Sequence, residues 1–458
     1  MRISFLLRVG VAVLALGGLA ACQQSTDAPS GATTDERPPP EEAGPRTVAL
    51  AQIDGRYTLT VDGEPFFIEG AGLEFGDIEA LAESGSNAFR TWRTDNGERS
   101  AKEVLDEAYE HGLMVAMGLE IAREREGEGR GVFGFDYDDE AAVAEQLERI
   151  RAEVEELKDH PALLFWGIGN ELNLGATNPA VWDAVNGISE MIHEVDPNHP
   201  TTTMLAGIGP ELVQEIEARA PDLDFLSVQF YADIENLALR LDEAGYDGPY
   251  VVTEWGATGH WEVETTPWDA PIENNSSVKA DLYRSRYVDH ILADTTNSLG
   301  SFVFLWGQKQ ERTPTWYGLF MPTGEETETV GVMEELWTDT VPDNRAPRLE
   351  SMTLDGQGAT DAVRLSPGET VPAVVATSDP DGDALRYAWE VRREQTVLSE
   401  GGDDEPEPEA IPGAVSPTDA AEVSLTAPTE PGAYRLFVAV FDGEGHAAHA
   451  NVPFYVGE

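Results

Sequence analysis

The chain has 458 residues, with 29 Lys and Arg against 85 Asp and Glu, which gives a formal net charge of −56. A single hydrophobic core rarely grows beyond about 250–300 residues, so this length predicts two domains. The negative charge argues against binding to nucleic acid or to anionic lipid head groups and favours neutral or cationic ligands, although a solvated surface alone also explains it.

Residues 1–21 are predicted to form a signal peptide. Arg2 and Arg8 supply positive charge, and an apolar stretch of roughly a dozen residues follows, too short to remain as a membrane-spanning helix. The segment LAAC that ends at Cys22 resembles a bacterial lipoprotein signal. That resemblance implies a lipidated Cys22 and, because Gln23 follows, an outer-membrane location in the cell envelope. The alternative is an ordinary signal with an incidental cysteine. Cys22 is the only cysteine, so one chain cannot form a disulfide.

Residues 22–46 are predicted to form a disordered tether, because they are rich in Pro, Gly, Ser, Thr and acids and contain almost no large apolar residues. The segment YTLTVDGEPFFIEG that comes next predicts a hairpin with its turn at Asp62 and Gly63.

Residues 47–340 alternate short apolar runs with amphipathic stretches. Two of these stretches have helical apolar spacing and begin at capping residues, Ser100 in one and Asp138 or Asp139 in the other. Strands that are apolar on both faces predict a parallel sheet, and about 290 residues is ordinary for a closed (β/α)8 TIM barrel, which makes the fold class α/β. A doubly wound open sheet is the alternative, but the segment EGAGLEFGD lacks a nucleotide-binding pattern. The eight runs are Phe66–Gly70, Asn87–Trp92, Leu113–Leu119, Leu163–Gly169, Thr201–Ala206, Phe225–Tyr231, Tyr250–Glu254 and Ser301–Trp306.

After a linker at residues 341–348, residues 349–458 lose the helical periodicity and predict a small all-β sandwich. The segment SDPDGD followed by LRYAWEV resembles the polycystic-kidney-disease-like and related immunoglobulin-like modules of secreted enzymes. Asp379, Asp381 and Asp383 in this segment indicate either a calcium site or a plain turn. The acidic stretch SEGGDDEPEPEAIPG predicts a disordered loop.

Active sites of (β/α)8 enzymes lie at the carboxyl ends of the strands. The fourth run ends at Asn170 and Glu171, and the seventh ends at Glu254. Two carboxylates across a barrel mouth provide what cleavage of a glycosidic bond needs, because one can protonate the leaving oxygen while the other attacks the anomeric carbon. The sequence therefore predicts a glycosidase active site.

The motifs WGIGNE and TEWG together resemble clan A of the glycoside hydrolases, which contains families 2, 5 and 72. The resemblance covers the barrel. It implies that Glu171 is the acid/base, that Glu254 is the nucleophile and that Asn170 binds the sugar 2-hydroxyl. It further implies supporting roles for Arg90 and Tyr231, both beside the nucleophile, and for Trp306 as the apolar floor under the sugar. Gln229 departs from the clan, in which many members have His or Asn.

Other residues near the expected mouth have two readings each. Glu120 is either a subsite residue or a solvated acid. The long loops after the seventh and eighth runs carry Trp261 and three further aromatics, which either stack on sugars or anchor the loops. These three are Trp268, Trp316 and Tyr317. His260 has no second ligand candidate, so no metal or other cofactor is expected.

The sequence thus predicts a surface-tethered retaining glycosidase that cleaves β-linked glycans, with the β-linkage implied by the clan resemblance only. Two alternatives stay open: a β-glucan transglycosidase of the family 72 kind, and a catalytically idle carbohydrate-binding envelope lipoprotein. The sugar, the linkage, and endo or exo action are not determined by the residues.

Overall fold

The computed structural model describes residues 39–74, 76–95, 97–127, 131–399, 402–403 and 405–457. The predicted signal peptide, Cys22 and most of the predicted tether lie outside these residues. From Pro39 onward the chain forms one compact unit. Within the described part of the chain, no helix is long and apolar enough to cross a membrane.

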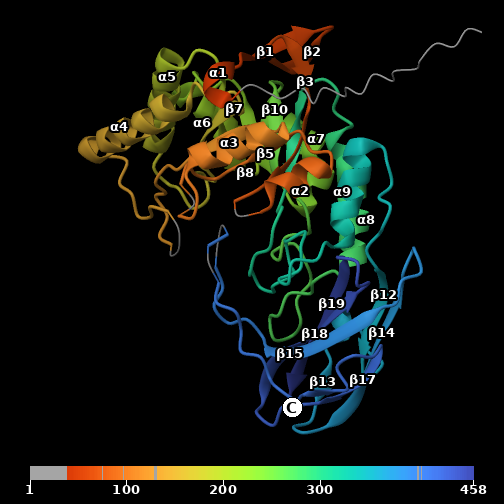
Figure 1. Ribbon diagram of the computed structural model, residues 1–458. Coiled ribbons are helices and arrows are strands. Elements are labelled where there is room, and N and C mark those ends of the chain that lie inside the picture. Colours follow the sequence, from red (N-terminus) through yellow and green to blue (C-terminus); the bar gives the residue numbers. More distant parts are fainter. Residues whose placement is uncertain are drawn as a thin grey trace, which may run out of the picture. The chain divides into compact units, whose positions relative to one another are not determined.

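Eight parallel strands close into a barrel, as the sequence predicts (Figure 1). The order around the ring is the chain order, with β11 pairing with β4 to close it. Each strand lies within two or three residues of the run that predicts it. The strands are β4 (Ile68–Gly72), β5 (Ala88–Arg90), β6 (Met114–Leu119), β7 (Leu163–Asn170), β8 (Thr201–Ala206), β9 (Leu226–Gln229), β10 (Tyr250–Trp255) and β11 (Ser298–Val303).

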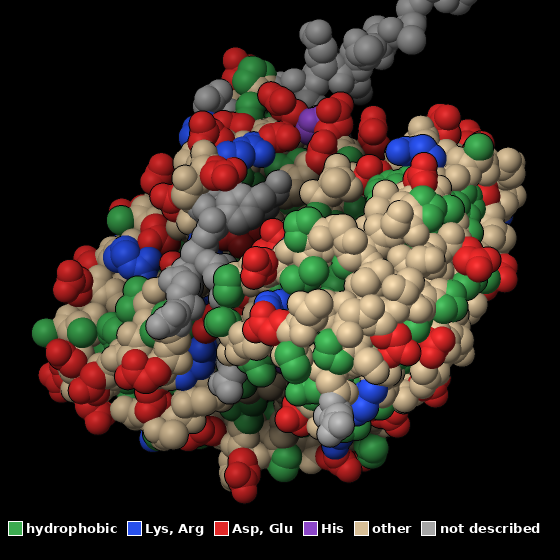
Figure 2. Space-filling view, turned by 90° about the horizontal axis from the view of Figure 1, so that it is seen from below, with side chains coloured by type: hydrophobic (Ala, Val, Ile, Leu, Met, Phe, Trp, Pro, Cys, Tyr) green, Lys and Arg blue, Asp and Glu red, His purple; other side chains and the backbone are tan. Residues whose placement is uncertain are grey.

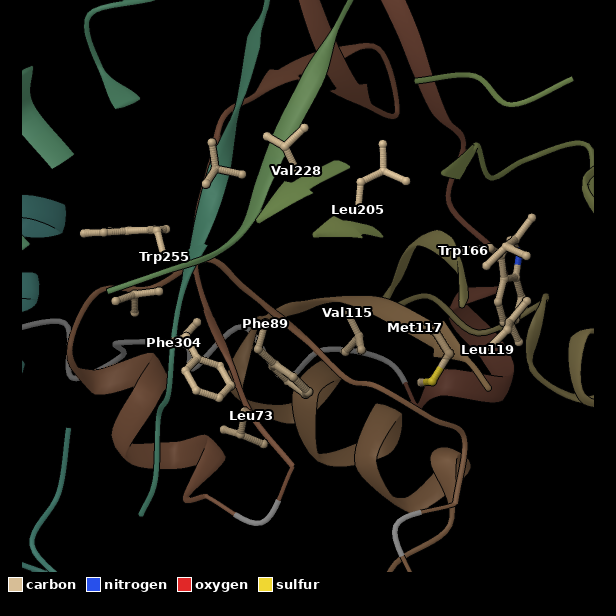
Figure 3. Packing of buried hydrophobic residues seen from close by; sticks show 14 of the residues in the cluster. Leu73, Phe89, Val115, Met117, Leu119, Trp166, Leu205, Val228, Trp255 and Phe304 are labelled. Atoms are coloured by element: carbon tan, nitrogen blue, oxygen red, sulfur yellow. The ribbon is translucent and has the colours of Figure 1, made fainter. Parts of the chain in front are cut away.

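Helices surround the barrel strands and bury their apolar faces against them (Figures 1 and 3). Ser100 and Glu103 form a capping box at the start of α3, and Asp139 caps α4, so both helices begin where the capping residues indicate. Leu73, Phe89 and Val115 belong to the core between strands and helices. The helices are α1 (Pro40–Ala43), α2 (Ile78–Glu83), α3 (Ala101–His111), α4 (Glu140–Leu157), α5 (Ala180–Val195), α6 (Pro210–Arg219), α7 (Leu237–Ala244), α8 (Ser276–Arg286) and α9 (Glu328–Thr338). Three single-turn segments are η1 (Ala232–Asn236), η2 (Tyr287–Ile291) and η3 (Ala359–Asp361).

An antiparallel sheet of β1 (Val48–Ile53), β2 (Arg56–Val61) and β3 (Glu64–Phe66) covers the amino-terminal end of the barrel. Its turn at Asp62 and Gly63, both with positive φ, is the predicted hairpin turn. Apolar side chains of β1 and β2 share a core with residues from the barrel interior. The opposite end of the barrel therefore remains available for a site.

The C-terminal residues form an all-β module with its own core, as predicted. One sheet has the order β12-β14-β17-β16 and the other β13-β19-β18-β15. Side chains of both sheets contribute to the shared core. The strands are β12 (Arg348–Leu354), β13 (Arg364–Leu365), β14 (Thr370–Ser378), β15 (Arg386–Arg393), β16 (Val415–Ser416), β17 (Glu422–Thr426), β18 (Gly432–Phe441) and β19 (Ala447–Val456). An immunoglobulin-like relationship of this module stays a prediction.

A buried polar network joins the module to the barrel. Glu273 accepts hydrogen bonds from Lys279 at 2.6 Å and from Asn451 of β19 at 2.6 Å. His449 of β19 donates its backbone N–H to the hydroxyl of Ser276 at 3.0 Å. Burial opposes ionisation of Glu273, but the charges of Lys279 and His449 and the hydrogen bonds outweigh it and lower the pKa of Glu273 to about 2. The network therefore fixes a charged group at the junction.

The segment that suggested calcium is a turn in this structure. One Oδ of Asp379 accepts hydrogen bonds from the backbone of Asp381, Gly382 and Asp383 at 2.7–3.0 Å, which is the geometry of an Asx turn. Asp381 forms an ion pair with Arg345 at 2.8 Å. Among the described residues no group of three or more metal-binding side chains exists, so calcium has no support here.

The acidic stretch between β15 and β16 is ordered in its described residues, so the prediction of disorder is wrong for them. Glu405 is buried and paired with Arg312, and Asp403 forms an ion pair with Arg125 at 3.0 Å. Further on, Ile411 donates its N–H to the Val391 carbonyl at 2.8 Å. Arginines far away in the sequence neutralise the acids, which composition alone does not reveal.

Candidate active site

A cavity of about 1130 Å³ opens at the carboxyl ends of the barrel strands. This is the end opposite to the sheet of β1, β2 and β3. Residues from most barrel strands and from the long loops line it, and the pair Glu171 and Glu254 lies among them. Other lining residues include Trp92, Arg123, Asn170, Gln229, Tyr231, Trp261, Phe304, Tyr317 and Asp403.

The strand β7 ends in a tight change of direction that presents Glu171 to the cavity. Gly169 has φ 75° and Glu171 has φ 53°, a conformation that is uncommon for a residue with a side chain. The backbone N–H of Glu171 donates to the carbonyl of Met204 in β8 at 2.9 Å, and the N–H of Leu174 donates to the Glu171 carbonyl at 2.9 Å. These bonds hold the conformation, so the carboxylate stands in a defined position at the strand end.

Four side chains donate hydrogen bonds to the carboxylate of Glu254, which is 5% exposed. One oxygen accepts from Arg90 at 3.1 Å, from the indole N–H of Trp92 at 3.0 Å and from Gln229 at 3.1 Å. The other accepts from the hydroxyl of Tyr231 at 3.0 Å. Donors from β5, β9 and the loops after them therefore satisfy the hydrogen-bonding capacity of a buried carboxylate.

Asn170 is oriented by the same donors. Its amide oxygen accepts hydrogen bonds from Arg90 at 2.8 Å and from Gln229 at 2.8 Å. With the oxygen engaged on this side, the amide nitrogen is the part of Asn170 that can donate to a bound molecule. Gln229, whose role the sequence leaves in doubt, thus links Asn170 to Glu254.

Arg90 is fully buried and lies between the two strand ends that carry the carboxylates. Burial lowers the pKa of Arg90, and the negative charges of Glu254 and Glu171 oppose that effect. A guanidinium keeps its proton under such conditions, so Arg90 contributes a fixed positive charge beneath the site.

Glu171 is the carboxyl group that can hold a proton near neutral pH. Burial is the largest cause, and the negative charge of Glu254 adds to it; together they raise the pKa of Glu171 to about 7, although Arg123 and Arg90 act in the opposite direction. Two carboxyl groups in such unlike environments can serve as an acid and a nucleophile. The arrangement is thus suited to acid-assisted displacement at a glycosidic carbon.

Trp306 is among the residues that line the cavity, and its role as an apolar floor under the sugar stays a prediction. Its side chain is 0% exposed, packs against Phe320 and Trp337, and donates its indole N–H to the Asp77 carbonyl at 3.1 Å. Phe304 instead turns its ring toward the aromatic residues of the site. The packing of each side chain in the segment after β11 depends on the direction in which it points, which the sequence motif does not specify.

Trp261 is the sequence-predicted aromatic that stands open at the cavity. It is 60% exposed, and its ring meets Tyr231 edge-on with 5.3 Å between ring centroids. Trp316 and Tyr317 are buried and anchor their loop, as in the plainer interpretation. Trp268 packs against Tyr455 of the C-terminal module. Only one of the four aromatics therefore forms an exposed platform.

Two further predictions concern the rim of the site. Glu120 is half-buried beside Arg93, with 3.9 Å between the charged atoms, and is not among the residues that line the cavity. His260 pairs with Glu311 at 3.4 Å. No metal-binding cluster includes either residue within the described part of the chain.

Sequence reasoning missed four contributors to this cavity. Trp92 stands two residues beyond Arg90 at the end of the second predicted run, so its place at a strand end was an available signal. Arg123 lies on the loop after β6, where nothing in the sequence marks it. Ser399 and Asp403 come from the C-terminal module and line the cavity, although they follow the first two barrel strands by more than 300 residues in the sequence.

Residues 73–275 match the family model of the glycosyl hydrolases family 2 TIM barrel domain. This stretch includes Asn170, Glu171 and Glu254. The matched stretch and the closed parallel barrel make this part of the chain similar to the barrel domains of that family. No curated protein sequence matches the chain.

Several solved structures are similar to parts of this chain. The β-glucuronidase of Bifidobacterium dentium in complex with coumarin-3-O-glucuronide is 18% identical, with a TM-score of 0.50 over 65% of this chain and 50% of its own. The β-glucuronidase of Dictyoglomus thermophilum is 19% identical, with a TM-score of 0.49 over 65% and 54%. A family 5 mannosidase of Rhizomucor miehei is 13% identical, with a TM-score of 0.43 over 63% and 97%. The chain spans about half the length of the two β-glucuronidases.

Proposed function

We propose that this protein is a retaining glycosidase that cleaves β-linked glycans by double displacement. The observation that carries the proposal is the unlike pair of carboxyl groups. Glu254 is buried and held by four hydrogen-bond donors, whereas the pKa of Glu171 is raised to about 7 by burial and by the charge of Glu254. Neither step needs a cofactor.

In the first step Glu254 attacks the anomeric carbon, the bond to the leaving oxygen breaks, and Glu171 transfers its proton to that oxygen. In the second step Glu171, now ionised, takes a proton from water. The water oxygen attacks the same carbon and releases Glu254. Arg90 and Tyr231 hold the nucleophile in place, and the amide nitrogen of Asn170 is available to the sugar 2-hydroxyl.

The test uses Glu254→Ala against aryl β-glycosides and a panel of β-glucans, mannans, xylans and galactans. We expect no turnover, and partial recovery with azide, which occupies the space of the missing carboxylate and forms a glycosyl azide of inverted configuration. Glu153→Gln is the matched control, because this acid belongs to α4 and does not line the cavity. An active alanine variant would refute the assignment.

Product analysis at high oligosaccharide concentration separates hydrolysis from sugar transfer, since both use the same carboxylate pair. An idle barrel is disfavoured because the full hydrogen-bond set around Glu254 is present. If the barrel is catalytically idle, neither the wild type nor Glu254→Ala should cleave any substrate of the panel.

We further propose that the protein is lipidated at Cys22 and held at the outer membrane. This proposal is supported by the sequence around Cys22 alone. Cells that express the full chain, labelled with a clickable fatty acid, should show a labelled band that Cys22→Ser loses and that partitions with outer-membrane fractions. An unlabelled wild-type protein would contradict it.

A further inference from the structure

The positive charges that line the active-site cavity have carboxylate partners, with one exception. In a chain with 85 acids and 29 bases, such pairing is the rule to expect. Acidic side chains are spread over the face seen in Figure 2, where Lys and Arg are fewer. The paired cations are Arg93 with Glu74 at 3.0 Å, Lys309 with Glu311 at 2.9 Å, and Arg312 with Glu405.

Arg123 is the exception among the described residues that line the cavity. None of the described carboxylates forms an ion pair with its guanidinium, although the charges of Glu120, Glu171 and Asp403 act on it from farther away. Burial and the like charge of Arg125 lower the pKa of Arg123, and those three negative charges partly offset that effect. A partly buried cation without a direct ion pair is unfavourable, so a negative group that bonds to it would gain from the contact.

The position of Arg123 is fixed before any ligand binds. Its backbone N–H donates to the Val132 carbonyl at 2.7 Å, and its own carbonyl accepts from the N–H of Phe135 at 3.0 Å. The guanidinium lies over the ring of Phe133, with 5.3 Å to the ring centroid. A preorganised guanidinium offers paired N–H donors whose geometry matches a carboxylate.

The neighbouring Arg125, unlike Arg123, forms an ion pair with a carboxylate. Arg125 also lies over Phe133, at 5.0 Å, but both of its terminal nitrogens donate to Asp403 of the C-terminal module, at 3.0 and 3.1 Å. Of two guanidinium groups beside one ring, the protein neutralises the one farther from the cavity lining and leaves Arg123 facing it.

We propose that Arg123 binds an anionic substituent of the sugar, a carboxylate or a sulfate, so that the preferred substrates are acidic β-glycosides. This inference rests on the proposed function and deepens it. It differs from the expectation of neutral or cationic ligands, because that expectation came from the net charge of the whole chain, whereas Arg123 is a single cation at the cavity that forms no ion pair with a described carboxylate.

The experiment measures kcat/KM for matched aryl β-glycosides: glucoside against glucuronide, galactoside against galacturonide, and each neutral sugar against its 6-sulfate. The quantity compared is the ratio of kcat/KM for the acidic substrate to kcat/KM for the matched neutral substrate. We expect wild type to favour one acidic series, and Arg123→Gln to lower that ratio by about 10- to 100-fold. A change in the pKa of Glu171 alters both substrates alike and cancels in the ratio.

Arg219→Gln is the matched control, since it removes the same charge from an exposed pair with Asp183 on the outer helices. Circular dichroism and thermal melting verify that each variant folds. Comparison of the uronide substrates with the 6-sulfated substrates identifies whether the preferred anionic group is a carboxylate or a sulfate. A wild type that prefers neutral sugars in every pair would overturn the inference, as would an Arg123→Gln variant with the wild-type ratio.

If wild type cleaves no glycoside, the proposed function fails, and binding decides the inference separately. Glucuronate, galacturonate and glucose 6-sulfate are then titrated against glucose by calorimetry. Tighter binding of one acid by wild type, lost in Arg123→Gln and kept in Arg219→Gln, supports the inference. Equal binding of acids and glucose overturns it.

Discussion

Glu171 should set the alkaline limit of activity near pH 7. Its pKa is raised to about 7, first by burial and then by the charge of Glu254. Because the acid form is the proton donor, activity should be present below this pKa and lost above it, by about tenfold for each further pH unit. A carboxyl with an ordinary pKa near 4.5 would be only about 0.3% protonated at pH 7, so the shift supplies roughly 150-fold more acid there.

The assay is kcat/KM from about pH 5 to about pH 9 on an aryl β-glycoside with a poor leaving group. Glu171→Gln is compared on a dinitrophenyl glycoside, whose leaving group departs without a proton. We expect the alkaline limb to vanish in this variant when formation of the glycosyl-enzyme is measured. A limb that persists unchanged in Glu171→Gln, or a wild-type limb below about pH 5.5, would refute the assignment of Glu171 as the acid.

Three further changes test other parts of the structure. Gln229→Leu removes donors to both Asn170 and Glu254 and should lower kcat/KM by about 10- to 100-fold with an unchanged melting temperature; a wild-type rate would argue against its bridging role. Trp261→Ala should raise KM several-fold and leave stability alone, which steady-state kinetics can check. Lys279→Met leaves Glu273 buried without its cation and should lower the free energy of unfolding by about 3–5 kcal/mol at neutral pH in a urea titration. The depressed pKa of Glu273, about 2, means that its stabilisation is complete above pH 4.5 and is lost as the pH falls toward 2, so the deficit of Lys279→Met should shrink there. If Lys279→Met lowered the free energy of unfolding equally at neutral pH and near pH 2, the result would contradict the ion pair between Lys279 and Glu273.

The barrel could be predicted because its signals are local. Apolar runs such as Leu163–Gly169 mark strands buried on both faces, and the polar residues that end them must gather at one end of a parallel barrel. That rule brings Glu171 and Glu254 to the same cavity although 83 residues separate them in the sequence. Arg90 and Tyr231 follow from the same rule, and both contact Glu254.

The sequence could not predict side-chain direction or contacts between distant segments. Trp306 and Phe304 stand two residues apart on the same segment, yet Trp306 packs against Phe320 and Trp337 whereas Phe304 packs against Tyr231 of the site. The acidic stretch near Asp403 has the composition of a disordered loop, but Arg125 and Arg312 hold it at the mouth of the barrel.

The sequence by itself therefore determined the barrel, the end of the barrel at which the site lies, and the two carboxylates. Strand periodicity and the ends of strands can be recognised from residues that are neighbours in the sequence. Only the tertiary structure decided how the site is charged. The raised pKa of Glu171 depends on burial and on Glu254, and Asp403 of the C-terminal module forms its ion pair with Arg125 and not with Arg123. Such properties arise from distances through space, which spacing along the chain does not specify.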